Sequence, residues 1–115
     1  MWRVRYYTTE SGRRPVYDLV KGSQRPARAK LLKITSLLEN IGPAAGMPYV
    51  RWLGGGLYEI RVRDRQELRV FYGFVGKETI VLLHGFIKKT FTIPAKELNI
   101  ARRRLKEIGL DQNIE

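Results

Sequence analysis

Residues 57–87 constrain the fold most, because they contain three strand-like stretches joined by very short turns. The stretches run from Leu57 to Arg63, from Glu67 to Phe74 and from Glu78 to Ile87. β-Branched and aromatic residues are frequent in them, as is typical of strands. The connecting residues 64–66 and 76–77 are short enough for hairpins. We therefore expect the three strands to form an antiparallel meander.

Two apolar stripes with helical spacing flank this meander. The first predicts a helix that ends at Gly42 and Pro43, and its members are Ala27, Leu31, Ile34, Leu38 and Ile41. The second predicts a helix from about Pro94 to Ile108 that Gly109 ends, and its members are Leu98, Ala101, Leu105 and Ile108.

Shorter elements complete the expected fold. Residues 2–7 and 50–53 are typical of strands, and Pro15 suits the first turn of a short helix that reaches about Lys21. The predicted fold class is α+β, with an antiparallel sheet of about four strands packed against two N-terminal helices and one C-terminal helix. We expect a single domain over residues 1–115, in which residues 110–115 form a frayed tail.

The unusual feature of the composition is a net charge of +11, from 22 Lys and Arg against 11 Asp and Glu. Such a field on a small surface attracts polyanions, and it favours either nucleic acid or an acidic protein as a partner. The chain has no cysteine, which excludes disulfides and thiolate metal sites. It also has neither a signal-peptide pattern at its start nor an apolar run long enough to span a membrane, so we expect a cytoplasmic protein.

Alternation along the strands places several cations on one face of the sheet. The other face of the first meander strand should meet the helices, and it consists of Tyr58, Ile60 and Val62. Arg61 and Arg63 lie opposite them, and Arg69 of the next strand should join them on an open, phosphate-binding surface. Phe86 of the last strand has the same parity as His84 and Lys88, and we expect its ring to stack a base.

Taken singly, each of these residues has a simpler explanation. An arginine on an outer sheet face is usually solvated, and a lone histidine such as His84 is more often a satisfied, half-buried residue than a catalyst. The chain shows no Ser/His/Asp or Cys/His set, and one histidine cannot form a multi-histidine metal site. Gly54 to Gly56 predict a flexible turn, because the lysine and hydroxyl residue of a P-loop do not follow. Only the shared face of the cations favours a functional surface.

Four blocks of sequence resemble the phage-derived, HigB-like branch of the RelE toxin superfamily. They are Gly56–Arg61, Leu68–Tyr72, Val81–Thr90 and Pro94–Ala101, in the family's order, and the resemblance extends over roughly residues 2–108. It implies helices that back a curved antiparallel sheet. It also implies an endoribonuclease that cuts mRNA, typically in the ribosomal decoding site, without a metal or other cofactor. The ribose 2′-hydroxyl attacks the adjacent phosphate and leaves a cyclic phosphate and a 5′-hydroxyl.

The resemblance also implies roles for particular residues. Arg69 matches the family's phosphate-clamping arginine, Arg61 and Arg63 match basic RNA-binding positions, and Lys88 and Lys89 match a catalytic basic pair. His84 is the catalytic residue whose ordinary pKa suits proton transfer near neutrality. Phe91 stands near the place where some members have a catalytic tyrosine, and a phenyl ring cannot give a proton. The family further implies a protein partner, an antitoxin expected to be of the helix-turn-helix type, which covers the basic face.

Two alternatives to the ribonuclease remain open. A ParE-like member of the superfamily would poison DNA gyrase and would not need a phosphate clamp, so the cluster of Arg61, Arg63 and Arg69 counts against it. A non-catalytic RNA-binding module would share every feature of the nuclease except proton transfer.

Overall fold

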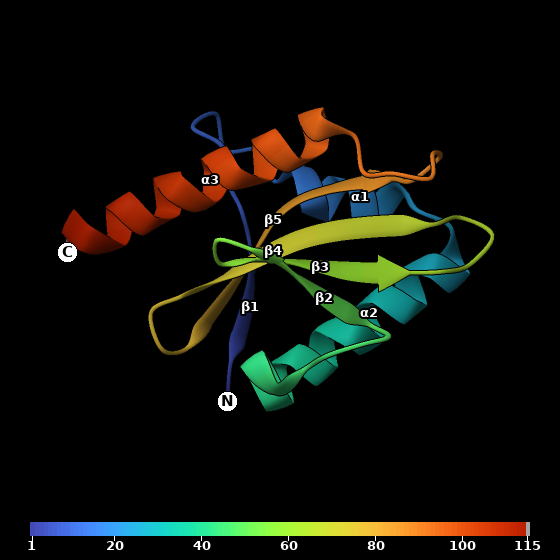
Figure 1. Cartoon of the computed structure of the whole chain (residues 1–115), viewed down its shortest axis with the longest axis horizontal. Helices are drawn as coiled ribbons and strands as arrows, with labels where there is room; N and C mark the ends of the chain where they lie inside the picture. The colour runs from blue at the N-terminus through green and yellow to red at the C-terminus, as the bar shows by residue number, and fades with distance from the viewer. Residues whose placement is uncertain (115) are drawn as a thin grey trace.

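A computed structural model describes residues 1–114, with the backbone alone for residues 110–114 (Figure 1). A five-stranded sheet lies between helices on its two sides. The elements are β1 (Arg3–Tyr6), α1 (Pro15–Gly22), α2 (Arg25–Ile41), the 3-10 helix η1 (Gly42–Ala44), β2 (Val50–Gly54), β3 (Leu57–Val62), β4 (Leu68–Val75), β5 (Thr79–Ile87) and α3 (Ala95–Ile114).

The strand order is β1-β5-β4-β3-β2, and the meander of β3, β4 and β5 is antiparallel as predicted. The prediction of an antiparallel sheet of about four strands is wrong in two respects. The sheet has five strands, and β1 pairs with β5 in parallel, so the sheet is mixed. The strand-like composition of residues 2–7 indicates a strand but not its direction, which is set by the way the two N-terminal helices lead the chain back across the sheet.

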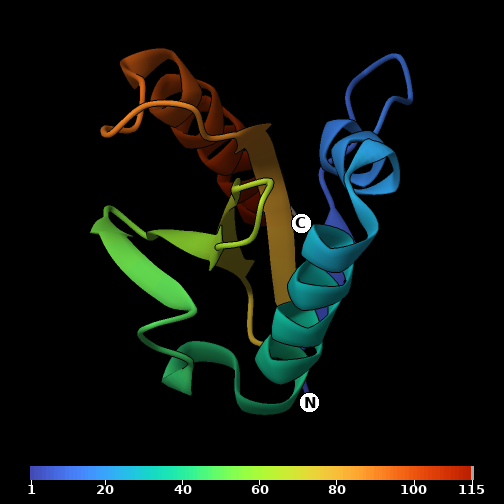
Figure 2. The same cartoon turned by 90° about the vertical axis from the view of Figure 1, so that its right-hand side faces the viewer.

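Helices α1 and α2 cover one face of the sheet (Figure 2). The core there contains the predicted α2 residues Ala27, Leu31, Ile34 and Leu38, while Ile41 is 41% exposed. The sheet contributes the predicted apolar face of β3, and Ile60 and Val62 are fully buried. Burial of this stripe accounts for the stability of α2, since propensity alone seldom holds a helix in place.

Helix α3 lies on the opposite face (Figure 2), so the prediction that this face is open is wrong for the part beneath the helix. It covers a second apolar core that contains Leu57, Phe71, Leu83, Phe86 and Ala101. A β-bulge between β4 and β5 contributes to this core, because the register passes from Tyr72 paired with Leu82 to Phe71 paired with His84. The extra residue, Leu83, therefore lies on the same side as His84 and Phe86 and makes this part of β5 apolar on the α3 side.

Close packing holds α3 against the sheet. A Cβ atom on Gly73 would lie 2.6 Å from Leu105 Cδ1, so the absence of a side chain at Gly73 admits the helix. The helix continues through Gly109 to Ile114, and the prediction that Gly109 ends it is wrong. The expected frayed tail falls on residues whose side chains, together with all of residue 115, lie outside the described part. No helix among the described residues is long and apolar enough to cross a membrane.

Candidate functional site

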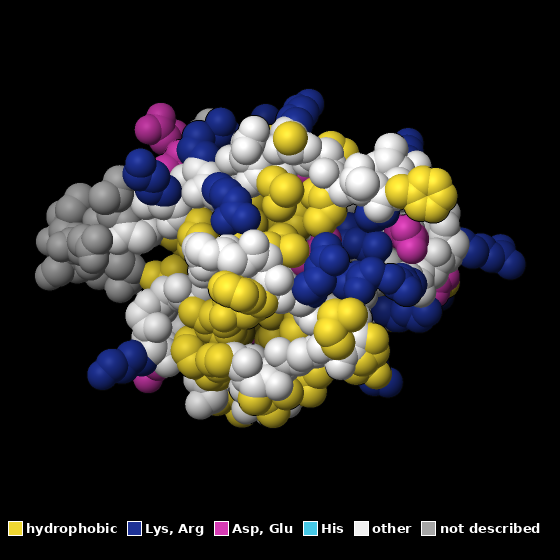
Figure 3. All heavy atoms as spheres, in the orientation of Figure 1, with side chains coloured by type: hydrophobic (Ala, Val, Ile, Leu, Met, Phe, Trp, Pro, Cys, Tyr) yellow, Lys and Arg dark blue, Asp and Glu magenta, His cyan; other side chains and the backbone are white. Residues whose placement is uncertain are grey.

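The α3 face of the sheet is hollowed into a groove beyond the part that the helix covers. This cationic groove has a volume of about 770 Å³, and Figure 3 shows Lys and Arg side chains gathered in this region. Its lining consists of Arg51, Glu59, Arg61, Arg63, Glu67, Arg69, Lys88, Lys89, Thr90, Phe91, Thr92 and Ile93. These residues come from three neighbouring strands, from the turn between β3 and β4 and from the loop between β5 and α3.

Strand register brings the arginines together. Arg51 of β2 lies directly opposite Glu59 of β3, and Arg61 lies directly opposite Arg69 of β4. Residues opposite one another on neighbouring strands have Cβ atoms about 5 Å apart, so their side chains share one surface. The predicted grouping of Arg61 and Arg69 on one face of the sheet is confirmed.

The loop after β5 closes the groove on the other side. The Lys88 amide donates to the Glu67 carbonyl, which continues the sheet pairing beyond β5. The Lys88 ammonium donates to the carbonyls of Thr90 and Phe91 and so folds the loop back on itself. Lys89 is exposed and lines the groove, so the basic pair predicted at this position lies beside the arginines.

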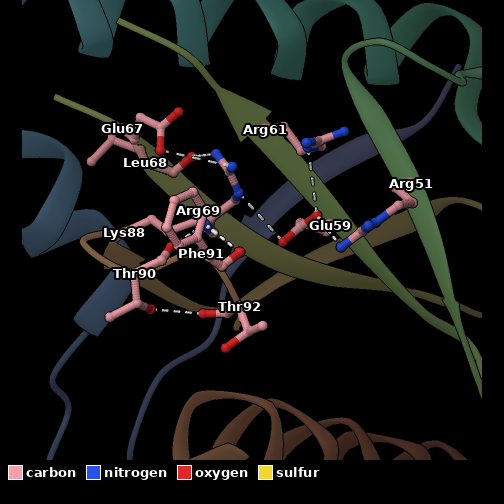
Figure 4. A network of polar contacts seen from close by, with 10 residues as sticks. All are labelled: Arg51, Glu59, Arg61, Glu67, Leu68, Arg69, Lys88, Thr90, Phe91 and Thr92. Carbon is pink, nitrogen blue, oxygen red and sulfur yellow. Dashed lines mark hydrogen bonds and ion pairs between the residues drawn. The ribbon is translucent and has the colours of Figure 1, made fainter. Parts of the chain in front are cut away.

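Glu59 occupies the centre of the arginine cluster (Figure 4). Its side chain is fully buried, and its carboxylate lies 3.2 Å from Arg51, 3.9 Å from Arg61 and 3.6 Å from Arg69. Within the described part of the chain, neither carboxylate oxygen has a hydrogen-bond partner of acceptable geometry. The contact between Glu59 and the arginines is thus one of charge rather than of directed hydrogen bonds.

Arg69 differs from the other arginines because it is buried. Its side chain is only 4% exposed, and it pairs with Glu59 and, at 4.0 Å, with Glu67. Burial lowers the pKa of Arg69, and the charge of Glu59 opposes this shift; the guanidinium still stays protonated near neutrality. The expectation that Arg69 lies on an open surface is therefore wrong, and two carboxylates already offset part of its charge.

The groove nevertheless keeps an excess of positive charge. Six Lys and Arg side chains line it, against two carboxylates. Arg51 and Arg63 are exposed and Arg61 is partly exposed, so these three can reach a ligand. An anion in the groove would meet guanidinium groups, which bind phosphate oxygens in a fork geometry.

The exposed aromatic ring at the groove is Phe91, not Phe86 as predicted. Phe86 is 9% exposed and packs against Phe71 in the core under α3, so it cannot stack a base. Phe91 is fully exposed and lines the cationic groove. The alternation of β5 does place Phe86 on the α3 face, but α3 covers that part of the face.

His84 does not line the cationic groove, and the proton-transfer role predicted for it has no support in this placement. Its Nε2 atom lies 2.9 Å from a Glu97 carboxylate oxygen, and its Nδ1 atom lies 3.5 Å from an Arg104 guanidinium nitrogen. Burial lowers the pKa of His84, while the hydrogen bond and charge of Glu97 act in the opposite direction. The imidazole thus connects β5 to α3, where it is satisfied within the fold.

A family model for phage-derived Gp49-like proteins (DUF891) matches residues 18–106. The chain belongs to the Gp49-like family. This is a RelE-like, toxin-like family associated with toxin–antitoxin systems. A search of curated proteins gives no match. The matched region of this Gp49-like chain contains every residue that lines the cationic groove.

Sequence reasoning missed Arg51 as a residue of the Gp49-like site. Its place follows from two facts, the burial of Val50 on the α2 side and the alternation of side chains along β2. The pairing of β2 with β3 also matters, because it sets Arg51 opposite Glu59. The pattern of residues 50–53 could have indicated the face of Arg51, but the register depends on the glycine turn and on an irregularity between Trp52 and Gly54.

Arg61 and Arg63 also border a second groove, on the α2 side of the sheet edge. This apolar groove has a volume of about 660 Å³ and lies where β2 no longer covers the end of β3. Its lining is Lys30, Lys33, Ile34, Leu37, Pro48, Tyr49, Arg61, Val62 and Arg63, which includes four cations but no carboxylate. Two arginines are thus shared between the two grooves of the Gp49-like fold.

No group of three His, Asp or Glu side chains in the described part of the chain is arranged to hold a metal ion. The solvent-accessible Lys and carboxylate groups that line the cationic groove are the ammonium groups of Lys88 and Lys89 and the carboxylate of Glu67. Glu67 is 37% exposed, whereas Glu59 is fully buried.

Proposed function

We propose that this Gp49-like chain is the toxin of a type II toxin–antitoxin pair, of the HigB-like branch, and that it is a metal-independent endoribonuclease that cuts mRNA. The observation that carries the proposal is the cationic groove, in which arginines from three strands and two lysines face an exposed aromatic ring. Such a surface suits a single strand of RNA, whose phosphates bind cations and whose bases stack on aromatic rings.

The proposed reaction is an internal transfer of the phosphoryl group. The ribose 2′-oxygen forms a bond to the adjacent phosphorus, and the bond from phosphorus to the 5′-oxygen breaks. The products are a 2′,3′-cyclic phosphate and a 5′-hydroxyl. Negative charge accumulates on the phosphate in the transition state, and the guanidinium groups of Arg61 and Arg63 lower its energy because they are already in place in the groove.

Two proton transfers must accompany this reaction. We assign Glu67 as the base, whose carboxylate accepts the proton of the 2′-hydroxyl. We assign Lys89 as the acid, whose ammonium donates a proton to the leaving 5′-oxygen. Both groups line the groove and both are reachable from solvent. His84 has no part in this assignment, because its imidazole is engaged by Glu97.

Messenger RNA bound in the ribosomal decoding site is the proposed substrate. A net charge of +11 supports binding to a surface of ribosomal RNA around the message. We assign the apolar groove to the second partner, an acidic antitoxin of the helix-turn-helix type. Carboxylates of that partner would pair with Arg61 and Arg63 and so compete with RNA for the same arginines.

Incubation of the purified chain with a translated message on ribosomes tests the nuclease. The expected products carry a cyclic phosphate and a 5′-hydroxyl, and they form in the presence of a chelator. Lys89→Ala and Glu67→Gln should each bind RNA yet cut it at least about 100-fold more slowly, as removal of a proton-transfer group does. Uncut message, or cutting that the chelator abolishes, would contradict the proposal.

A non-catalytic RNA-binding module is the second candidate, and one observation favours it. The only histidine lies outside the groove, so proton transfer rests on a lysine and a carboxylate. RNA binding without any cleavage on ribosomes would support this second reading.

A further inference from the structure

Three arginines of the cationic groove converge on one carboxylate. Arg51, Arg61 and Arg69 come from β2, β3 and β4, and each has a guanidinium nitrogen within 4.0 Å of Glu59. Arg61 and Arg69 are direct neighbours across the two strands, and like charges in that position repel. The buried carboxylate offsets this repulsion and compensates the charge of Arg69, which is itself buried.

Glu59 does this without occupying the donors of the arginines. Neither of its oxygens makes a directed hydrogen bond within the described part of the chain, and the buried Nε of Arg61 also has no partner there. Among those residues, the one side-chain hydrogen bond of Arg69 goes to the Leu68 carbonyl, and the side chains of Arg51 and Arg61 form none. A guanidinium carries five N–H donors, so most donors of Arg51 and Arg61, which are exposed and partly exposed, remain available to a ligand.

We propose that Glu59 is the positioning residue of the groove, whose carboxylate holds Arg51, Arg61 and the buried Arg69 together as one cationic unit, in which Arg51 and Arg61 bind phosphate. Glu59 is fully buried and therefore acts through the arginines, not by touching RNA. The inference rests on the proposed function, because it assigns to Arg51 and Arg61 a role in binding the RNA backbone.

The proposal makes a prediction that is opposite in sign to that of simple electrostatics. Glu59→Gln keeps the size of the side chain and makes the groove more positive, so charge alone would tighten RNA binding. Positioning predicts weaker binding, because the guanidinium groups would repel one another and separate. Glu67→Gln is the matched control, since it removes the same charge from the same groove but from a partly exposed side chain that contacts Arg69 only at 4.0 Å.

The experiment measures binding of a fluorescent 2′-O-methyl RNA of about 12 nucleotides, which cannot be cleaved, over a series of salt concentrations. We expect Glu59→Gln to bind about tenfold more weakly than the wild type, and to lower the salt slope by about one phosphate contact. Glu67→Gln should bind as tightly as the wild type or more tightly. Glu59→Asp, which keeps the charge, should recover most of the affinity, and a merely structural role would leave the salt slope unchanged.

Tighter binding by Glu59→Gln, as in the control, would overturn the positioning role while leaving the proposed function intact. If the wild type does not bind the RNA, the proposed function itself is contradicted, and the role of Glu59 toward RNA with it. Should Glu59→Gln fail to fold, Arg51→Gln/Glu59→Gln provides the test in a background with one cation fewer. The double variant should bind more weakly than Arg51→Gln alone, and tighter binding would overturn the proposal.

Discussion

Arg63 and Arg69 line the same groove, but their surroundings give them different energetic roles. Arg69 is buried beside a buried carboxylate, and removal of one partner of such a pair leaves the other uncompensated. Arg69→Ala should therefore lower the free energy of unfolding by about 3 kcal/mol. Arg63 is exposed, and Arg63→Ala should change stability by less than about 0.5 kcal/mol while it weakens RNA binding. Denaturant unfolding of both variants checks this, and equal stability would contradict the burial argument.

Phe91 offers an aromatic face at the groove, and its contribution should appear in binding alone. Phe91→Ala should weaken binding of single-stranded RNA by about 1–3 kcal/mol, the usual value of one stacked base, and leave stability unchanged. Phe91→Tyr should retain the affinity. Phe86→Ala is the contrasting variant, because loss of a buried ring should destabilise the fold by about 3 kcal/mol or more. Unaltered RNA affinity in Phe91→Ala would refute the stacking role.

The alternation of side chains along each strand predicted part of the candidate site. It placed Arg61 and Arg69 on one face correctly, because a strand has a period of two whatever surrounds it. It could not reveal that Arg69 and Phe86 are buried, since burial depends on elements that pack from elsewhere in the chain. Alternation also could not reveal the contacts of His84, because its partners Glu97 and Arg104 belong to α3.

At the scale of the elements, local signals predicted the meander and the long N-terminal helix, and non-local ones determined the rest. The turns on either side of β4 are so short that they favour hairpins. The apolar stripe of α2 lies on one side of the helix, and that side must be buried. The parallel pairing of β1 and the bulge at Leu83 depend on which strand edges meet in space. Gly109 did not end α3, which shows that a weak helix former is tolerated once the preceding turns pack on the sheet.

The contact between β5 and α3 should depend on pH through His84. Burial holds the pKa of His84 below its ordinary value in the folded protein, so the unfolded chain binds the proton more readily. The part of the free energy of unfolding that depends on neutral His84 is therefore fully present above about pH 6.5. It decreases as the pH falls below that value. His84 is the only histidine of the chain, so His84→Gln should remove most of the change between about pH 7.5 and about pH 5.5.

Thermal unfolding of the wild type and of His84→Gln at the two pH values measures this difference in stability. Arg104 and Lys96 disfavour the imidazolium, in agreement with burial, whereas Glu97 favours it. Greater stability of the wild type at the lower pH would contradict the argument and would show that the charge of Glu97 outweighs burial.

For the whole molecule, the arrangement of charge connects the fold to the proposed function. Two helices seal one face of the sheet, α3 seals part of the other, and the cations collect where the second face stays uncovered (Figure 3). The composition predicted a polyanionic partner from the net charge alone, but it could not locate the surface that binds it. The surface became visible only when the strands and the loop after β5 were brought together.

Mapping of transcript 5′ ends after induction of the chain in a bacterium tests the central claim most directly. The account predicts growth arrest with loss of full-length messages and new 5′-hydroxyl ends within coding regions, and it predicts neither effect for the Lys89→Ala variant. Intact transcripts in arrested cells, together with altered DNA supercoiling, would contradict it and support a gyrase poison of the ParE type.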